Sequence, residues 1–215
     1  MRLILVCNPD KISNQTNPLN SMKIIISTIL MMFSAFTLLE NAAPATVNKS
    51  ESTITWNAKK VTGEHYGKVP ISNANLDYSN GKITGGSFDM DMVNLTVEDV
   101  TDANTNKKLA DHLKSDDFFS VAKFNTSTFK ITDAKSSNGK DYTITGNLTI
   151  KGITNPVTFP ATVAVEGGKI VANGNITFDR TKYDIKFRSG NYFEDLADKM
   201  IYDDVTLKVK LVAAI

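Results

Sequence analysis

Strict alternation of apolar and polar residues marks several stretches of this chain. It runs through residues 88–92, 142–150 and 205–211. Because successive side chains of a β-strand point to opposite faces, this pattern predicts strands with one dry face and one solvated face. Runs rich in β-branched and aromatic residues predict further strands over residues 52–58, 61–78, 124–131, 157–165 and 170–178.

Turn-forming pairs separate these runs. Asn80-Gly81, Asn138-Gly139 and Gly167-Gly168 have the residue types of two-residue hairpin turns, in which both central positions take positive φ. Asn155-Pro156 interrupts another run and predicts a strand edge or a bend. Many short strands at fairly even spacing indicate an antiparallel sandwich or barrel, in one domain.

One segment has helical rather than strand spacing. In residues 106–115, Leu109, Ala110 and Leu113 recur at helical intervals among lysines and aspartates. We expect a short amphipathic helix there, lying across one end of the β structure.

The start of the chain has the features of an export signal. Met22-Lys23 precedes an apolar run over residues 24–39, and Ala43-Pro44-Ala45 follows it, as in a secretory signal peptide. The run is shorter than the roughly 20 residues of a membrane-spanning helix, so we expect no stable membrane insertion of the mature chain. We predict translation from Met22, cleavage near Ala45, and a periplasmic or secreted domain over residues 46–215.

Charge and motifs exclude several classes of function. The net charge is +1, whereas nucleic-acid binders normally carry a basic face, so no nucleic-acid partner is expected. Neither a phosphate-binding GxxxxGK[ST] loop nor a GxSxG nucleophile elbow occurs. Only His65 and His112 are present, without metal-ligand spacing, and Cys7 lies in the leader. We therefore predict no metal, no cofactor and no enzymatic activity.

The apolar faces of the strands supply candidate ligand contacts. If the sheet closes, these side chains point into the lumen and either pack as a core or line a cavity for a hydrophobic tail. The predicted inward set is Trp56, Phe88, Met90, Met92, Phe124, Phe129, Leu148, Ile150, Phe159 and Phe178.

Two arginines are candidate contacts for a head group. Arg180 and Arg188 are the only arginines after the leader. A guanidinium suits bidentate capture of phosphate or carboxylate. We predict that Arg180 or Arg188, with His65, holds an anionic head near one barrel mouth; the alternative is ordinary exposed charge on an outer strand face.

Three groups of residues resemble the YceI-like family of exported bacterial proteins. The most specific is His112-Leu113-Lys114-Ser115-Asp116-Asp117-Phe118-Phe119, and residues 146–157 match the family's G-x-L-T-x-x-G-V-T-x-P-V pattern. Trp56, Gly63, His65 and Gly67 match its opening pattern. The similarity covers residues 52–211; Asn125 replaces a usual proline, and residues 191–204 form a longer segment.

The resemblance implies an all-β fold, a lipocalin-like eight-stranded antiparallel β-barrel with a short helix. It also implies a lumen that sequesters or carries a polyisoprenoid or similar long-chain amphiphile, such as a fatty amphiphile, without catalysis. Family members include dimers, so a homodimer is among the expected states. Two alternatives stay open: a hydrolase or isomerase that acts on such a lipid, and a structural stress-response protein whose barrel is filled by its own side chains.

Overall fold

The computed structural model describes residues 45–215. The predicted leader, the start at Met22 and Cys7 lie outside the described residues, and the predicted cleavage site falls at their first residue. The strands are β1 (Ala45–Val47), β2 (Thr53–Lys60), β3 (Gly63–Lys68), β4 (Ile71–Ser79), β5 (Lys82–Asp91), β6 (Thr126–Lys135), β7 (Asp141–Ile150), β8 (Ile153–Glu166), β9 (Lys169–Asp179) and β10 (Ile201–Ala214). The helices are α2 (Ala103–Lys114) and the 3₁₀ turns η1 (Arg180–Tyr183) and η2 (Ala197–Lys199).

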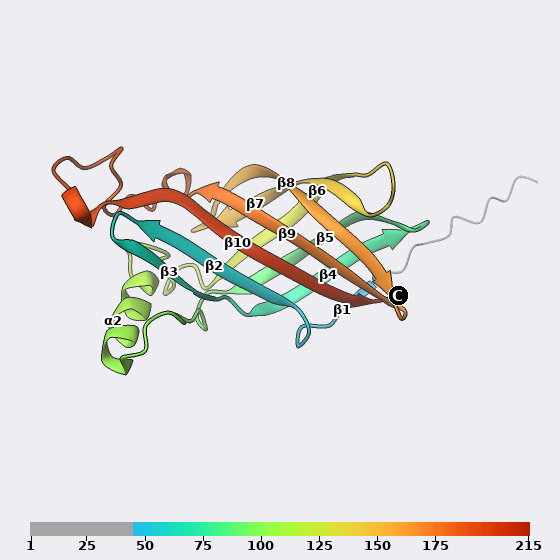
Figure 1. Cartoon of the computed structure of the whole chain (residues 1–215), viewed down its shortest axis with the longest axis horizontal. Helices are drawn as coiled ribbons and strands as arrows, with labels where there is room; N and C mark the ends of the chain where they lie inside the picture. The colour runs from blue at the N-terminus through green and yellow to red at the C-terminus, as the bar shows by residue number, and fades with distance from the viewer. Residues whose placement is uncertain (1–44) are drawn as a thin grey trace, which may run out of the picture. The chain divides into compact units, whose positions relative to one another are not determined.

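These strands form one antiparallel sheet that closes on itself (Figure 1). The short strand β1 closes it, because β1 pairs with both β4 and β10. β1 and β2 share one edge of β10, and only Val69 and Pro70 separate β3 from β4. The ten strands therefore occupy eight positions, and the predicted lipocalin-like barrel is confirmed.

Two of the predicted hairpin turns are confirmed by their backbone angles. Asn80 and Gly81 have φ of 51° and 77°, and Gly167 and Gly168 have φ of 56° and 76°. Both are two-residue turns, between β4 and β5 and between β8 and β9. A third turn of this kind, Lys151-Gly152 between β7 and β8, was not predicted because lysine is not a typical turn residue.

The prediction of a two-residue turn at Asn138-Gly139 was wrong. The connection between β6 and β7 runs over residues 136–140, and of this pair only Gly139 has positive φ. The side-chain oxygen of Asn138 instead accepts hydrogen bonds from the backbone N–H groups of Lys140 and Asp141. This local bonding stabilises a longer loop.

Prolines mark where strand pairing is interrupted. The predicted run over residues 61–78 is broken at Pro70, because proline has no N–H for a ladder bond. Asn155 and Pro156 lie in the part of β8 that pairs with β7 but not with β9, since the β8–β9 pairing begins at Ala161. The predicted strand edge is therefore confirmed.

The predicted amphipathic helix is α2, which begins earlier than expected. Asp102 caps it by accepting a 2.8 Å hydrogen bond from the N–H of Thr105. Its buried Leu113 faces the barrel core, and α2 lies at the same end of the barrel as the β2–β3 turn (Figure 1). Within residues 45–215, no helix is long and apolar enough to cross a membrane.

The alternation seen in the sequence produces the core. In β7, every second residue from Tyr142 to Ile150 is buried, and the residues between them are exposed or half-buried. The buried apolar side chains of all the strands form one continuous cluster inside the barrel. Below, the inside of the barrel is called the lumen.

Candidate functional site

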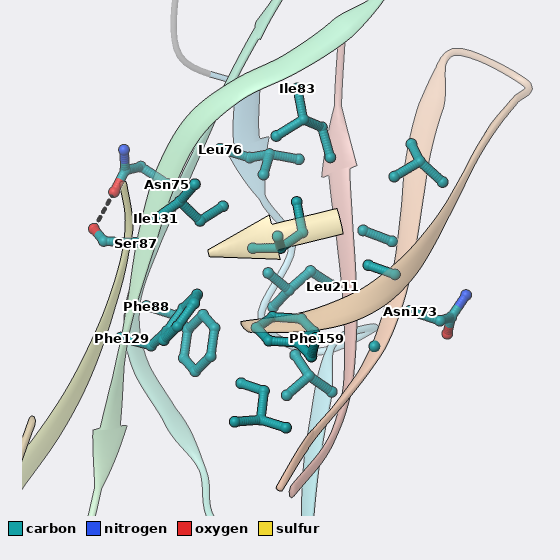
Figure 2. Close-up of a pocket in the computed structure, with 17 residues that line it drawn as sticks. Asn75, Leu76, Ile83, Ser87, Phe88, Phe129, Ile131, Phe159, Asn173 and Leu211 are labelled. Carbon is teal, nitrogen blue, oxygen red and sulfur yellow. Dashed lines mark hydrogen bonds between the residues drawn. The ribbon is translucent and has the colours of Figure 1, made fainter. Parts of the chain in front are cut away.

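The lumen contains two apolar pockets. The outer chamber, nearer α2, is lined by residues that include Trp56, Met90, Met92, Leu113, Phe118, Ile150, Phe178 and Leu207. The inner chamber, farther from α2 and shown in Figure 2, is lined by residues that include Leu76, Ile83, Phe88, Phe129, Phe159, Ile176 and Leu211. The inner lining comes from the strands, whereas the outer lining combines strand residues with Leu113 of α2 and with loop residues such as Met92 and Phe118.

Most of the predicted inward residues line these chambers. Five of the ten line the outer chamber and three line the inner chamber, namely Trp56, Met90, Met92, Ile150 and Phe178, and then Phe88, Phe129 and Phe159. Leu148 is fully buried in the same core but lines neither chamber. Contact of these residues with a ligand stays a prediction.

Phe124 is the exception in the predicted inward set. It is half-buried and lines neither chamber, and its ring lies beside Gly152 in the β7–β8 turn. The reason is that Phe124 precedes β6, which begins at Thr126, so strand alternation does not fix where its side chain points. Its placement in the lumen was therefore wrong.

The chambers are narrow. Their cavity volumes are only about 60 and 50 Å³. A water needs roughly 10–15 Å³ of such space, so each chamber has room for only a few waters. A long tail would therefore enter only if lining side chains move. The unbranched thioethers of Met90 and Met92 make such movement easier.

A wider, solvent-open pocket of about 400 Å³ lies next to the outer chamber. We call it the mouth. Its polar lining is basic, with one carboxylate: Lys59, Lys60, His65, His112, Arg188, Lys199 and Asp198. The mouth and the outer chamber share the wall residues Trp56, Ala58, Leu113, Phe118 and Ile201. A polar opening therefore leads directly into an apolar interior.

His65 is held in the mouth by a carboxylate. Its Nδ1 lies 2.7 Å from Oδ2 of Asp99, and the other oxygen of Asp99 accepts a 3.0 Å hydrogen bond from the N–H of Tyr66. Burial alone would raise the pKa of Asp99, but the hydrogen bonds from Tyr66 and His65 outweigh it and leave this pKa below its ordinary value. The pairing fixes the position of the His65 ring at the rim.

Arg188 is exposed at the mouth, as the head-group prediction requires. It adopts a positive φ of 51°, and its guanidinium carbon lies 5.1 Å from the ring centre of Phe187. Among residues 45–215 it has no acidic partner within ion-pair distance. Its N–H groups are therefore available to a ligand.

Arg180 has a different environment from the one predicted. Its side chain is only 3% exposed, four of its N–H groups donate hydrogen bonds inside the fold, and its Nη2 also forms an ion pair. The partners are the backbone oxygens of Tyr202, Ile185, Phe187 and Ile201, at 2.9–3.1 Å, and the carboxylate of Asp203, at 3.1 Å. Arg180 thus joins the loop after η1 to the start of β10, a structural role that already uses four of its donors.

Several mouth residues were not singled out from the sequence. Lys59 and Lys60 end β2, and Lys199 lies in η2 just before β10. Pairing of β10 with β2 brings these distant segments together, which no local pattern reveals. His112 also reaches the mouth, where its ring packs edge-on against Phe118 and Phe187 at 5.0 and 4.9 Å.

Neither histidine belongs to a metal-binding group. In the described part of the chain, no cluster of three or more His, Cys, Asp and Glu side chains is placed to hold a metal ion. His112 Nε2 instead lies 2.9 Å from Oδ2 of Asp117, so each histidine pairs with one carboxylate.

A closed antiparallel barrel with a polar mouth over an apolar lumen defines a lipocalin-like protein. Sequence comparison gives the particular family: the model of the YceI-like domain matches residues 46–213. The chain belongs to the YceI-like family.

Two relatives illustrate the extent of the sequence match. A UPF0312 protein of Enterobacter sp. (strain 638) is 44% identical over 78 residues, which cover 36% of this chain and 40% of the relative. Protein YceI of Escherichia coli is 42% identical over 78 residues, with the same coverage. The chain spans about two fifths of the length of these curated relatives.

Solved structures share the fold at low sequence identity. BcnA of Burkholderia cenocepacia has a TM-score of 0.64 and 24% identity, over 78% of this chain and 99% of that protein. A polyisoprenoid-binding domain from Saccharophagus degradans, implicated in plant cell wall breakdown, has a TM-score of 0.57 and 10% identity, over 81% of this chain and all of that domain. At these identities the likeness shows the fold alone.

Proposed function

We propose that the protein is an exported lipid-binding protein that sequesters or carries a polyisoprenoid or similar long-chain amphiphile. The tail lies in the lumen and the head group lies at the mouth. The observation that carries this proposal is the shared wall between the basic mouth and the apolar outer chamber, because one amphiphile would contact both. The fold shared with a polyisoprenoid-binding domain supports it.

The charge of the mouth favours an anionic head group. Lys59, Lys60, Arg188 and Lys199 face it, against the single carboxylate of Asp198. Within residues 45–215 none of these four cations has an ion-pair partner. A phosphate or carboxylate would supply the missing negative charge, with Arg188 able to bind it through two N–H groups.

Tail burial supplies the affinity. Moving methylenes from water into the lumen contributes about 0.8 kcal/mol each, so a long chain binds well without a specialised residue. This explains how an ordinary-looking apolar lining can serve a specific lipid. Binding of this kind needs no catalytic group.

Trp56 provides a direct test. It is the only tryptophan of the chain, it lines both the mouth and the outer chamber, and its Nε1 donates a 2.9 Å hydrogen bond to the carbonyl of Thr96. Titration with a polyisoprenyl phosphate should change its fluorescence and saturate at one lipid per barrel.

Two observations favour the alternative functions. The titration, followed by recovery of the lipid, distinguishes them from our proposal. The narrow chambers favour a barrel filled by its own side chains, which would give no fluorescence change with any amphiphile. The His65–Asp99 pair favours a hydrolase or isomerase, because a carboxylate-oriented imidazole suits a general base. In that case the lipid recovered after incubation would be chemically altered; under our proposal it is recovered intact.

A further inference from the structure

Three phenylalanine rings lie in a row inside the lumen. The ring centres of Phe88 and Phe129 are 5.2 Å apart, and those of Phe129 and Phe159 are 5.6 Å apart. They come from β5, β6 and β8, and Figure 2 shows them side by side below Leu76 and Ile83. We call them the phenylalanine row.

The phenylalanine row lies where the inner chamber meets the outer chamber. On β5, Phe88 lines the inner chamber and Met90, the next inward residue, lines the outer one. On β6, Phe129 lines the inner chamber and Ser127 lines the outer one. No lining residue is common to the two chambers, whereas the mouth and the outer chamber share a wall. Phe88 and Phe129 therefore stand on the side of the inner chamber that faces the outer chamber.

Two glycines let the rings occupy this position. Gly146 on β7 and Gly174 on β9 sit at inward-facing positions. A Cβ at Gly174 would lie 2.8 Å from Cε2 of Phe159, and one at Gly146 would overlap the ring of Phe129. The rings thus lie against the backbone of the neighbouring strand, in recesses that exist only because glycine has no side chain. This is a specific arrangement rather than loose filling of space.

We propose that the phenylalanine row is the floor of the tail site and sets the longest tail that the outer chamber accepts. The proposal rests on the proposed function, and it adds a length limit for the ligand. A tail that reaches the row gains nothing from further methylenes, because these stay outside the apolar interior. Removing a ring joins the two chambers and admits a longer chain.

The test is a series of straight-chain alkyl phosphates of increasing length, titrated against the full-length protein by Trp56 fluorescence. Each methylene that enters the lumen should tighten binding about fourfold, the equivalent of its transfer free energy. For the wild type the dissociation constant should fall with chain length and then level off. In Phe129→Ala and Phe159→Ala, levelling should occur at a longer chain.

Controls keep the outcomes distinct. Phe129→Leu and Phe159→Leu remove less volume and should shift the levelling point less, which carries the test if an alanine variant does not fold. Phe124→Ala removes a phenylalanine that lines neither chamber and should leave it unchanged. The proposed floor would be contradicted if the wild-type dissociation constant kept falling with chain length. It would also be contradicted if the folded Phe129 and Phe159 variants levelled off at the same chain length as the wild type. Absence of binding at every chain length would overturn the proposed function instead.

Discussion

The two arginines of the described chain differ in what surrounds them. Arg180 is buried, bonded to four backbone oxygens and paired with Asp203, whereas Arg188 is exposed at the mouth. Removing one partner of a buried, hydrogen-bonded charge pair costs about 3–5 kcal/mol, so Arg180→Ala should lower the free energy of unfolding by that order. Arg188→Ala should change it by less than about 0.5 kcal/mol. Urea unfolding of both variants measures the difference.

Binding should show the reverse order of effects. Loss of a charge-assisted hydrogen bond to an anionic head costs about 1.5–3 kcal/mol, so Arg188→Ala should weaken binding of a polyisoprenyl phosphate at least tenfold. Arg188→Lys keeps the charge but loses bidentate geometry, and an intermediate loss is expected. Equal stability of the Arg180 and Arg188 variants, or unchanged affinity of Arg188→Ala, would contradict these roles.

The pairing of Asp99 makes part of the stability depend on pH. Its folded-state pKa lies below the ordinary value, so its charged form stabilises the fold at pH values above about 3.9. That contribution is lost as pH falls through the lower, folded-state pKa. Asp99→Asn should therefore be less stable than the wild type at neutral pH, with a difference that shrinks below about pH 4. Urea unfolding across this range measures it; a constant difference would count against the pairing.

At the residue scale, the alternation of apolar and polar residues predicted the lumen residues well. The mouth residues were predicted poorly. Nine of the ten predicted inward side chains are in the core; eight of them lie in strands, where alternation decides their direction, and Met92 directly follows β5. The prediction for Phe124 was wrong because this residue precedes β6, where alternation does not fix the direction of a side chain. The prediction for Arg180 was wrong because a buried arginine depends on acceptors and a carboxylate from segments whose meeting no local pattern predicts.

Among the elements, helix α2 has the most direct bearing on ligand entry. Its Leu113 lines both the mouth and the outer chamber, so the side chain narrows the passage between them. Leu113→Ala should lower the free energy of unfolding by about 2 kcal/mol, the low end for a buried leucine beside an existing pocket. It should also speed both association and dissociation of lipid, as followed by stopped-flow Trp56 fluorescence.

Leu109 offers a matched control on the same helix. It lines the mouth but not the outer chamber, so Leu109→Ala should leave the exchange rates close to those of the wild type. Equal rates for the two leucine variants would mean that α2 does not restrict the passage. The helix itself was predictable from its apolar spacing, which is a local signal, whereas its start at the Asp102 cap was missed.

Closure of the barrel belongs to the whole molecule, and the pattern of residues left it open. The alternating strands fit a sandwich as well as a barrel, and the resemblance to a family decided between them. Closure depends on pairing between residues far apart in the chain, such as Thr46 with Ala214. The mouth has the same origin, since it gathers Lys59, His112 and Arg188 from separate segments.

Export and lipid binding both concern the whole molecule. We propose that cleavage near Ala45 releases the barrel into the periplasm or the medium, where a long-chain lipid needs a carrier in water. The apolar run over residues 24–39 and the A-x-A motif that ends at Ala45, the first residue of β1, support export. Sequestration in the lumen keeps the tail away from water while the head stays at the rim.

Native mass spectrometry of the protein, expressed with its leader and purified from the exported fraction, is the decisive test of whether the barrel binds a lipid. Organic extraction then identifies whatever is bound. We expect one long-chain amphiphile per barrel, or stoichiometric uptake of added polyisoprenyl phosphate by the empty protein. A clean ligand-free mass with no uptake of that lipid or of a fatty amphiphile would contradict it, and would show a lumen closed by its own side chains.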